Sequence, residues 1–554
     1  MKPCQVSIRE YSTLEALSDY LGIFLIASVI LASFEWLLIS KISYIVYIEG
    51  FVTVVLSHLV FRRKIVYLPK EKSIVFYITC LFYLSILLTY LYAFPYFPLF
   101  PSADFKTHLQ NALAFTEGMY SSSLPANPAV ELLLSAWLSI GFDNPLFYTR
   151  LFIMLLNWST IFHVYALGHK IGGRKVGEVA SISYTLVSPF WYHTLIEAGL
   201  YANLLGIVIG LCFIRWFITM LEKQGIIRYF LIIVTSSVLI LSHSSSILIL
   251  AACIMAVIYL RFFEGEDLKL RLIALPIIGF LLVLLTMPSL IFRLPSALQG
   301  PYFMATTSDV ILEFLKHAPF LSYIYAFNSI SLVLFALITI TFIQSVLNKR
   351  LGYYSIFYLW FFGAFGLSFF SSNAWRFALL SFIPMCVLSV KVFNDILLPI
   401  FSKIEAYMLN PQTRRLLKYQ LICLVIIVLM FYSTADPLPA FRFASWSRDQ
   451  QNNVYDAMLW FAQNTEQNAC AVSISNSQFY FLPYIAHREF LGIFPSGHPD
   501  TVYSYLKDHR PGYVIVWNRL HPYNETWHYV DLYHDSPYFV EVWSNYEFTI
   551  FKVK

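Results

Sequence analysis

The chain has 554 residues, of which 58% are hydrophobic and only 12% are charged, and its mean hydropathy is +0.65. Soluble domains carry about 25% charged residues, so this composition excludes an ordinary soluble globular protein. The formal net charge of +5 is modest and the basic residues fall in short loops, which are topology signals rather than a nucleic-acid surface. We therefore expect membrane lipids, and no nucleic acid, among its partners.

Apolar runs of about 18–25 residues recur along roughly the first 435 positions, and this is the length that a helix needs to cross the hydrocarbon of a bilayer. The pattern predicts a polytopic α-helical membrane protein with about thirteen transmembrane helices. The predicted spans lie near 20–40, 43–61, 73–93, 146–167, 176–195, 199–221, 228–242, 246–262, 271–290, 321–346, 352–371, 376–398 and 419–435.

Six loops, which follow the even-numbered spans, are strongly basic. Their basic residues are Arg62, Arg63, Lys64, Lys70 and Lys72, then Lys170, Arg174 and Lys175, then Lys223 and Arg228, then Arg261, Lys269 and Arg271, then Lys349 and Arg350, and finally Lys403, Arg414, Arg415 and Lys418. Cytoplasmic loops carry the excess of lysine and arginine in membrane proteins. We therefore expect a multi-pass protein of the cell membrane, with a cytoplasmic N-terminus and an extracytoplasmic C-terminal domain.

The first long outside loop, residues 94–145, begins with the polar island Pro101–His108. Asp104 and His108 are four positions apart and would share one face of a helix. Ionisable groups at a bilayer boundary must be wet or paired, which makes these two candidates for function. The alternative is a structural one, in which Asp104 only caps an amphipathic helix. The rest of the loop predicts interfacial helices on the outer leaflet.

Two further outside turns hold candidate residues. His193 and Glu197 are also four apart, at the outer end of the fifth span, and Tyr201 follows them. They are either site residues or a structural His–Glu pair that closes a helix hairpin. His243 lies in a tight turn between two spans, where a hydrogen-bonded turn residue and a ligand are both compatible with the sequence.

An arginine opens the twelfth span on the outer side, against the positive-inside trend. This residue is Arg376, and its guanidinium could bind a phosphate with two hydrogen bonds. The alternative is that Arg376 only extends to lipid headgroups. Arg293, in the second long outside loop, is a second candidate for binding phosphate.

Residues 436–554 read as a small soluble α/β domain, separate from the transmembrane part at 1–435. The apolar spacing predicts two helices and four strands, at 454–464 and 502–508 for the helices and at 470–474, 512–517, 539–543 and 548–553 for the strands. The domain has no nucleotide-binding fingerprint. Asn524-Glu525-Thr526 is a glycosylation sequon, which is consistent with an outside location.

Taken together, the motifs resemble those of the GT-C superfamily of integral membrane glycosyltransferases. The resemblance lies in Asp104–Leu109 followed by Gly118 and Pro125, in the phrase Gly199–Gly206, and in an arginine that opens a late span. At the level of architecture it covers nearly the whole chain. In many relatives, however, the acidic loop follows the first span, whereas here it follows the third. The tail also lacks the WWDYG-type motif of oligosaccharyltransferases.

The resemblance implies a hexosyl- or pentosyltransferase that takes a sugar from a polyprenyl-phosphate carrier, such as a dolichol phosphate. The acceptor would be a glycan, lipid or protein of the cell envelope. It further implies that Asp104 is the catalytic base, that His108 orients a group or binds phosphate, and that Arg376 binds the donor phosphate. The sequence leaves open whether Asp104 and Glu197 hold a divalent metal.

Three other functions stay open from the sequence. A transporter of lipid-linked saccharides would carry polar residues deep inside its spans, whereas the candidates here gather at one face. A saccharide polymerase or ligase would use the same kind of donor. A non-enzymatic surface scaffold would use residues 436–554 for display.

Overall fold

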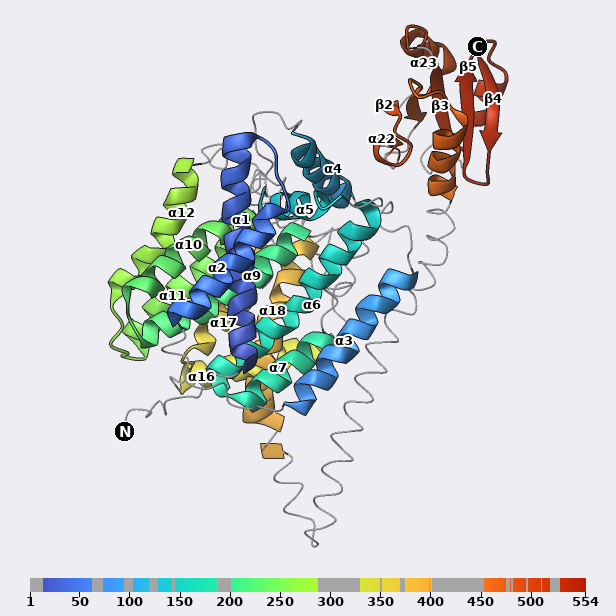
Figure 1. Ribbon diagram of the computed structural model, residues 1–554. Helices are drawn as coiled ribbons and strands as arrows, with labels where there is room; N and C mark the ends of the chain where they lie inside the picture. Colours follow the sequence, from blue (N-terminus) through green and yellow to red (C-terminus); the bar gives the residue numbers. More distant parts are fainter. Residues whose placement is uncertain are drawn as a thin grey trace, which may run out of the picture. The chain divides into compact units, whose positions relative to one another are not determined.

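The structure, a computed structural model, describes residues 13–61, 73–93, 103–118, 128–141, 145–187, 201–286, 329–348, 351–368, 374–397, 399–400, 453–474, 479, 482–494, 497–509, 511–518 and 529–554. These residues fall into two compact units, one built mainly from the chain up to Asp436 and the other mainly from Pro437–Lys554. The first unit is helical, and the second contains a β-sheet (Figure 1).

The helices of the first unit follow the predicted spans closely. They are α1 (Thr13–Ile39), α2 (Ile45–Phe61), α3 (Ile74–Ala93), α4 (Ala103–Glu117), α5 (Pro128–Leu138), α6 (Pro145–Gly172), α7 (Arg174–Val187), α9 (Tyr201–Glu222), α10 (Ile226–Ser242), α11 (Ile247–Phe263), α12 (Ala274–Thr286), α16 (Ser329–Leu347), α17 (Tyr354–Ser368) and α18 (Ala374–Val392). Each predicted span up to 376–398 overlaps one of these helices, and the span predicted at 419–435 lies outside the described residues. Helices α4 and α5 lie in the loop that was predicted to hold interfacial helices.

The helical unit has the properties of a membrane protein. Three described helical segments are long and apolar enough to cross a membrane, namely Thr13–Ile39, Phe147–Gly172 and Tyr201–Glu222, and further apolar helices are shorter. Large apolar side chains are exposed on the outside of the bundle, including Leu38 at 82% and Leu285 at 79%. Many exposed large apolar side chains are typical of a surface that contacts lipid. The number of thirteen crossings stays a prediction.

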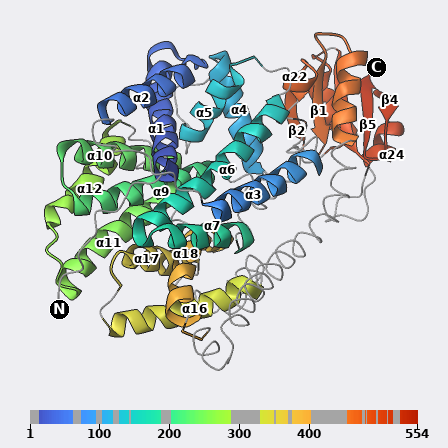
Figure 2. The same cartoon turned by 60° about the horizontal axis from the view of Figure 1, so that its bottom comes forward.

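Helix α9 lies at the centre of the bundle and packs against α1, α6 and α10 (Figure 2). It is buried on all sides, which explains why its sequence is apolar all round. Close packing depends on its glycines. A Cβ atom at Gly206 would lie 2.7 Å from Ser246 Oγ, and one at Gly210 would lie 2.5 Å from Ile249 Cδ1. Small residues therefore let α9 approach the turn before α11.

Charged pairs gather at one end of the bundle. Asp19, near the start of α1, pairs with Arg215 in the second half of α9. His169 Nδ1, near the end of α6, lies 3.1 Å from Glu15 Oε2, and Lys170 Nζ lies 2.5 Å from Glu222 Oε2. The start of α1 and the ends of α6 and α9 therefore share this end, which we call the charged end.

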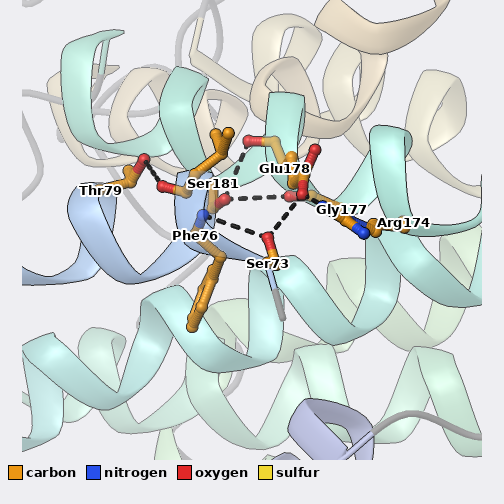
Figure 3. A network of polar contacts seen from close by, with 8 residues as sticks. Ser73, Phe76, Thr79, Arg174, Gly177, Glu178 and Ser181 are labelled. Carbon is orange, nitrogen blue, oxygen red and sulfur yellow. Dashed lines mark hydrogen bonds and ion pairs between the residues drawn. The ribbon is translucent and has the colours of Figure 1, made fainter. Parts of the chain in front are cut away.

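Figure 3 shows how α3 and α7 are joined at their first turns. Ser73 Oγ accepts a hydrogen bond from the backbone N–H of Phe76 at 3.2 Å and so caps α3. The same hydroxyl donates to Glu178 Oε1 at 2.5 Å, and Arg174 Nε donates to that carboxylate oxygen at 2.9 Å. The cap of one helix is thus tied to an ion pair on the other.

The second unit contains a five-stranded sheet in the order β2-β1-β3-β5-β4. Its strands are β1 (Cys470–Ile474), β2 (Glu489–Phe494), β3 (Gly512–Trp517), β4 (Phe539–Ser544) and β5 (Phe548–Val553), and its helices are 453–464, α22 (Leu482–Ile485), α23 (Pro499–Leu506) and α24 (Tyr529–His534). Strand β1 is parallel to β2 and β3, whereas β5 is antiparallel to β3 and β4. The sequence predicted these strands except β2.

The core of this unit lies against the central strands. Every residue of β1 is buried, which fits a strand whose two faces are both covered. Val472, Val514 and Phe551 are fully buried members of one apolar cluster, together with Tyr533 from α24. Cys470 is a free, buried thiol at the start of β1. These apolar contacts explain why a short sheet of five strands is stable.

Candidate functional site

Helix α4 places three polar residues along one face. Asp104 lies in its first turn, His108 one turn later and Asn111 about one turn after that. Residues spaced by four and three positions share one side of an α-helix. Only the backbone of Asp104 belongs to the described part of the chain, whereas the His108 side chain is described and buried, with 8% of the residue exposed.

A buried carboxylate on α5 holds this face of α4. Glu131 is 2% exposed, and its Oε1 lies 3.0 Å from His108 Nδ1. Asn111 Nδ2 donates to the same oxygen at 2.9 Å. Glu131 Oε2 is buried and has no hydrogen-bond partner among the described residues. Burying a carboxylate is costly unless it is paired and hydrogen-bonded, and His108 and Asn111 meet this need at one oxygen.

Helix α5 is a rigid support for Glu131. Nearly all of its residues are buried. Thr116 Oγ1 and Ser135 Oγ, 3.0 Å apart, join it to α4, and Tyr47 of α2 donates a hydrogen bond to the Leu133 carbonyl at 2.6 Å. Leu132 also packs in an apolar cluster with Phe115 of α4. Packing and hydrogen bonds of this kind fix side-chain rotamers.

Tyr201 completes the surroundings of His108. It is the first residue of α9, is 1% exposed, and its ring centroid lies 6.0 Å from that of His108. Arg150, near the start of α6, is 4% exposed and interacts electrostatically with Tyr201. The starts of α6 and α9 are the ends opposite to the charged end. The structure thus brings together His108 and Tyr201, which sequence analysis had named separately.

His243 occupies a hydrogen-bonded turn after α10. Its Nδ1 accepts a hydrogen bond from the backbone N–H of Ser245 at 3.1 Å and lies 2.6 Å from Ser245 Oγ. The turn packs against α9, where a Cβ at Gly206 would lie 3.4 Å from His243 Cβ. The His243 turn therefore supports the helix that begins with Tyr201.

Other sequence-predicted residues are placed only in part. Arg376 is the third residue of α18, and its side chain lies outside the described part of the chain. His193, Glu197 and Arg293 lie outside the described residues altogether. Within the described residues, no three His, Cys, Asp or Glu side chains are grouped to hold a metal ion. Glu197 and the side chain of Asp104, the metal ligands that the sequence suggested, lie outside the described residues.

Sequence analysis missed Glu131, Asn111 and Arg150. Glu131 is the one charged residue of the apolar helix Pro128–Leu138. Arg150 lies close to the start of a long apolar helix. A single charge inside an apolar run near a membrane boundary is a signal that could have identified both. Asn111 could have been found from its helical spacing to Asp104 and His108.

No family profile matches the sequence, and no curated protein sequence matches it. Solved structures that are similar to it include the following three. The archaeal oligosaccharyltransferase AglB from Archaeoglobus fulgidus, in complex with an inhibitory peptide and a dolichol-phosphate, has a TM-score of 0.44 at 12% identity, and the match covers 72% of this chain and 62% of that one. A crystal structure of the Archaeoglobus fulgidus oligosaccharyltransferase with Zn and sulfate has a TM-score of 0.42 at 12% identity, and the match covers 72% and 60%.

The third structure is ArnT from Cupriavidus metallidurans in the apo state, with a TM-score of 0.49 at 11% identity, and the match covers 85% of this chain and 97% of that one. The chain thus spans about three fifths of the length of the two oligosaccharyltransferases.

Proposed function

We propose that this protein is an integral membrane glycosyltransferase that moves a sugar from a polyprenyl-phosphate carrier to an acceptor hydroxyl on the extracytoplasmic face. One observation carries the proposal. The face of α4 with Asp104 and His108 is held by buried Glu131 at the end of the bundle opposite to the charged end. With about thirteen spans and a cytoplasmic charged end, this site faces the outside.

The reaction needs a base near the acceptor. The acceptor oxygen bonds to the anomeric carbon, the bond from that carbon to the phosphate oxygen breaks, and the acceptor proton passes to a base. Asp104 is the proposed base, since it lies on α4 one turn before His108. A positioned base typically contributes about 10²–10⁴-fold to the rate.

The reaction also needs positive charge or hydrogen-bond donors at the leaving phosphate. His108 is the proposed group on α4, and Arg376 at the start of α18 is the proposed guanidinium, with Arg293 as the second candidate. Fixed donors placed where charge develops are worth more in a site that excludes water. The burial of His108 and Glu131 provides such surroundings.

The experiment is a transfer assay with the purified full-length protein in lipid nanodiscs and a panel of polyprenyl-phosphate sugars. The wild-type chain should release polyprenyl phosphate and form a glycosylated acceptor. Asp104→Asn should lower kcat by about 10²-fold or more, because the amide keeps the shape but cannot take a proton. Asp267→Asn is the matched control, since that carboxylate is fully exposed in a loop after α11. Near wild-type turnover of Asp104→Asn would remove Asp104 from the mechanism.

A further inference from the structure

We infer that Glu131 is a positioning residue, which fixes the imidazole of His108 so that Nδ1 carries a proton and Nε2 is the atom that meets the lipid phosphate. The inference rests on the proposed function and deepens it. Glu131 would act on the substrate only through His108, so it is not itself a catalytic residue.

Hydrogen bonding defines which nitrogen of His108 carries the proton. Asn111 Nδ2 donates to Glu131 Oε1 at 2.9 Å, so this oxygen is an acceptor. His108 Nδ1 lies 3.0 Å from the same oxygen and must therefore be a donor. This holds for the neutral ring and for the cation. Nε2 lies on the opposite side of the ring from Nδ1, and in the cation it carries a second proton that it can donate to a phosphate oxygen.

The position of the ring is fixed as firmly as its tautomer. Glu131 lies on the buried helix α5. The Tyr201 ring lies beside the imidazole, with the two ring centroids 6.0 Å apart. A histidine held from two helices loses little freedom when the donor binds. Catalytic groups need such support, because moving one of them by about 1 Å from its productive position lowers the rate strongly.

Stability alone does not explain a buried carboxylate here. Replacing a buried ion pair by apolar residues of similar volume is often neutral or stabilising. Glu131 also keeps Oε2 buried without a hydrogen-bond partner among the described residues, which adds to its desolvation cost. Apolar contacts such as that of Leu132 with Phe115 already join α4 and α5. A polar pair at this position is therefore better explained by what it does to His108.

The test is a double-mutant cycle of His108→Gln and Glu131→Gln in the full-length protein, with kcat, KM for the donor and thermal stability measured for each variant. We expect Glu131→Gln to lower kcat about 10–100-fold, by analogy with carboxylates that orient metal-binding histidines. In the His108→Gln background, the same change should alter kcat by less than about twofold, because residues that act as one unit are not additive. Glu131→Asp, which keeps the carboxylate, should recover part of the loss.

Glu178→Gln is the matched control, since Glu178 is another carboxylate that holds two helices together, here α3 and α7 at the charged end. It should lower thermal stability without changing kcat. Losses that multiply in the double variant, or a Glu131→Gln variant with wild-type kcat, would overturn the positioning role while leaving the proposed function intact. A wild-type protein that transfers no sugar from any polyprenyl-phosphate donor would overturn both.

Discussion

Phosphate recognition at the residue level depends on which arginine meets the donor. We expect Arg376→Lys to raise KM for the lipid-linked donor and to lower kcat more than Arg293→Lys does. Lysine keeps the charge but loses the two-pronged geometry of the guanidinium. If Arg376 only extends to headgroups, lysine would replace it well.

The measurement is steady-state kinetics of both variants beside Arg261→Lys, a control in the last turn of α11, where Arg261 pairs with exposed Asp267. A defect in Arg293→Lys with normal kinetics of Arg376→Lys would place the phosphate site in the second long outside loop.

Glu466 gives the C-terminal unit a dependence on pH. Its hydrogen bond with Lys552 at 2.8 Å is the main cause that lowers its pKa from 4.5 to about 2, with a further contribution from Tyr513. A folded pKa below the unfolded one stabilises the fold above about pH 4.5, and this stability is lost as the pH falls toward 2. The pair is nearly half exposed, so its contribution should stay below about 1 kcal/mol.

Labelling of Cys470 measures this effect in a full-length chain whose other cysteines are replaced by alanine. Burial raises the pKa of this thiol to about 11, so it should react with dithiodipyridine only when the unit unfolds. The denaturant midpoint for labelling should be lower in Lys552→Met than in the wild type at pH 6, and the difference should shrink as the pH falls through 4.5 toward 2. A difference that is constant with pH would disprove the role of Glu466.

Sequence reasoning at this scale named His108 and Tyr201 as candidates but missed Glu131, which contacts His108. The i, i+4 spacing that singled out Asp104 and His108 is local, so it can be read from the chain. The contact between His108 and Glu131 joins positions 23 apart and depends on how α4 crosses α5. Spacing along one helix carries no information about that crossing.

At the scale of helices, the close packing of α9 against the His243 turn positions Tyr201 beside His108. Gly206→Ala should lower thermal stability and transfer activity, because the new Cβ would lie 2.7 Å from Ser246 Oγ and push α9 away from the His243 turn. Overpacking of this kind costs about 1–3 kcal/mol. Since Tyr201 begins α9, its ring should shift against His108.

Ser246→Ala in the Gly206→Ala background removes the atom that clashes and should recover much of the loss. Gly366→Ala is the control in α17, where an added Cβ would meet nothing within 4 Å, and it should be neutral or slightly stabilising. Equal effects of alanine at Gly206 and Gly366 would show that close packing at α9 is unimportant.

Elements themselves were largely predictable. Long apolar runs predicted the helices, and runs such as Gly512–Trp517 predicted strands, because periodicity is a local property. Strand β2 was missed, since Glu489–Phe494 is interrupted by Gly492, a residue with low strand propensity, and contains a register shift against β1. The sheet order could not be read, because it is decided by contacts between distant segments.

For the whole molecule, the membrane topology decides on which side of the membrane the His108 site lies. We expect a cysteine in place of Asp267, in an exposed loop near the basic residues, to react with an impermeant reagent only after permeabilisation. A cysteine in place of Tyr546, 77% exposed on the C-terminal unit, should react in intact cells. The opposite pattern would place the His108 site in the cytoplasm.

The most direct test of the account is a structure of the full-length protein with a non-transferable polyprenyl-phosphate sugar. The lipid phosphate should lie within hydrogen-bonding distance of His108 Nε2, with Glu131 still bonded to Nδ1 and the anomeric carbon facing the first turn of α4, where Asp104 lies. A phosphate bound at the charged end, beside the Arg174–Glu178 pair, would contradict the proposed site and the direction in which the enzyme faces.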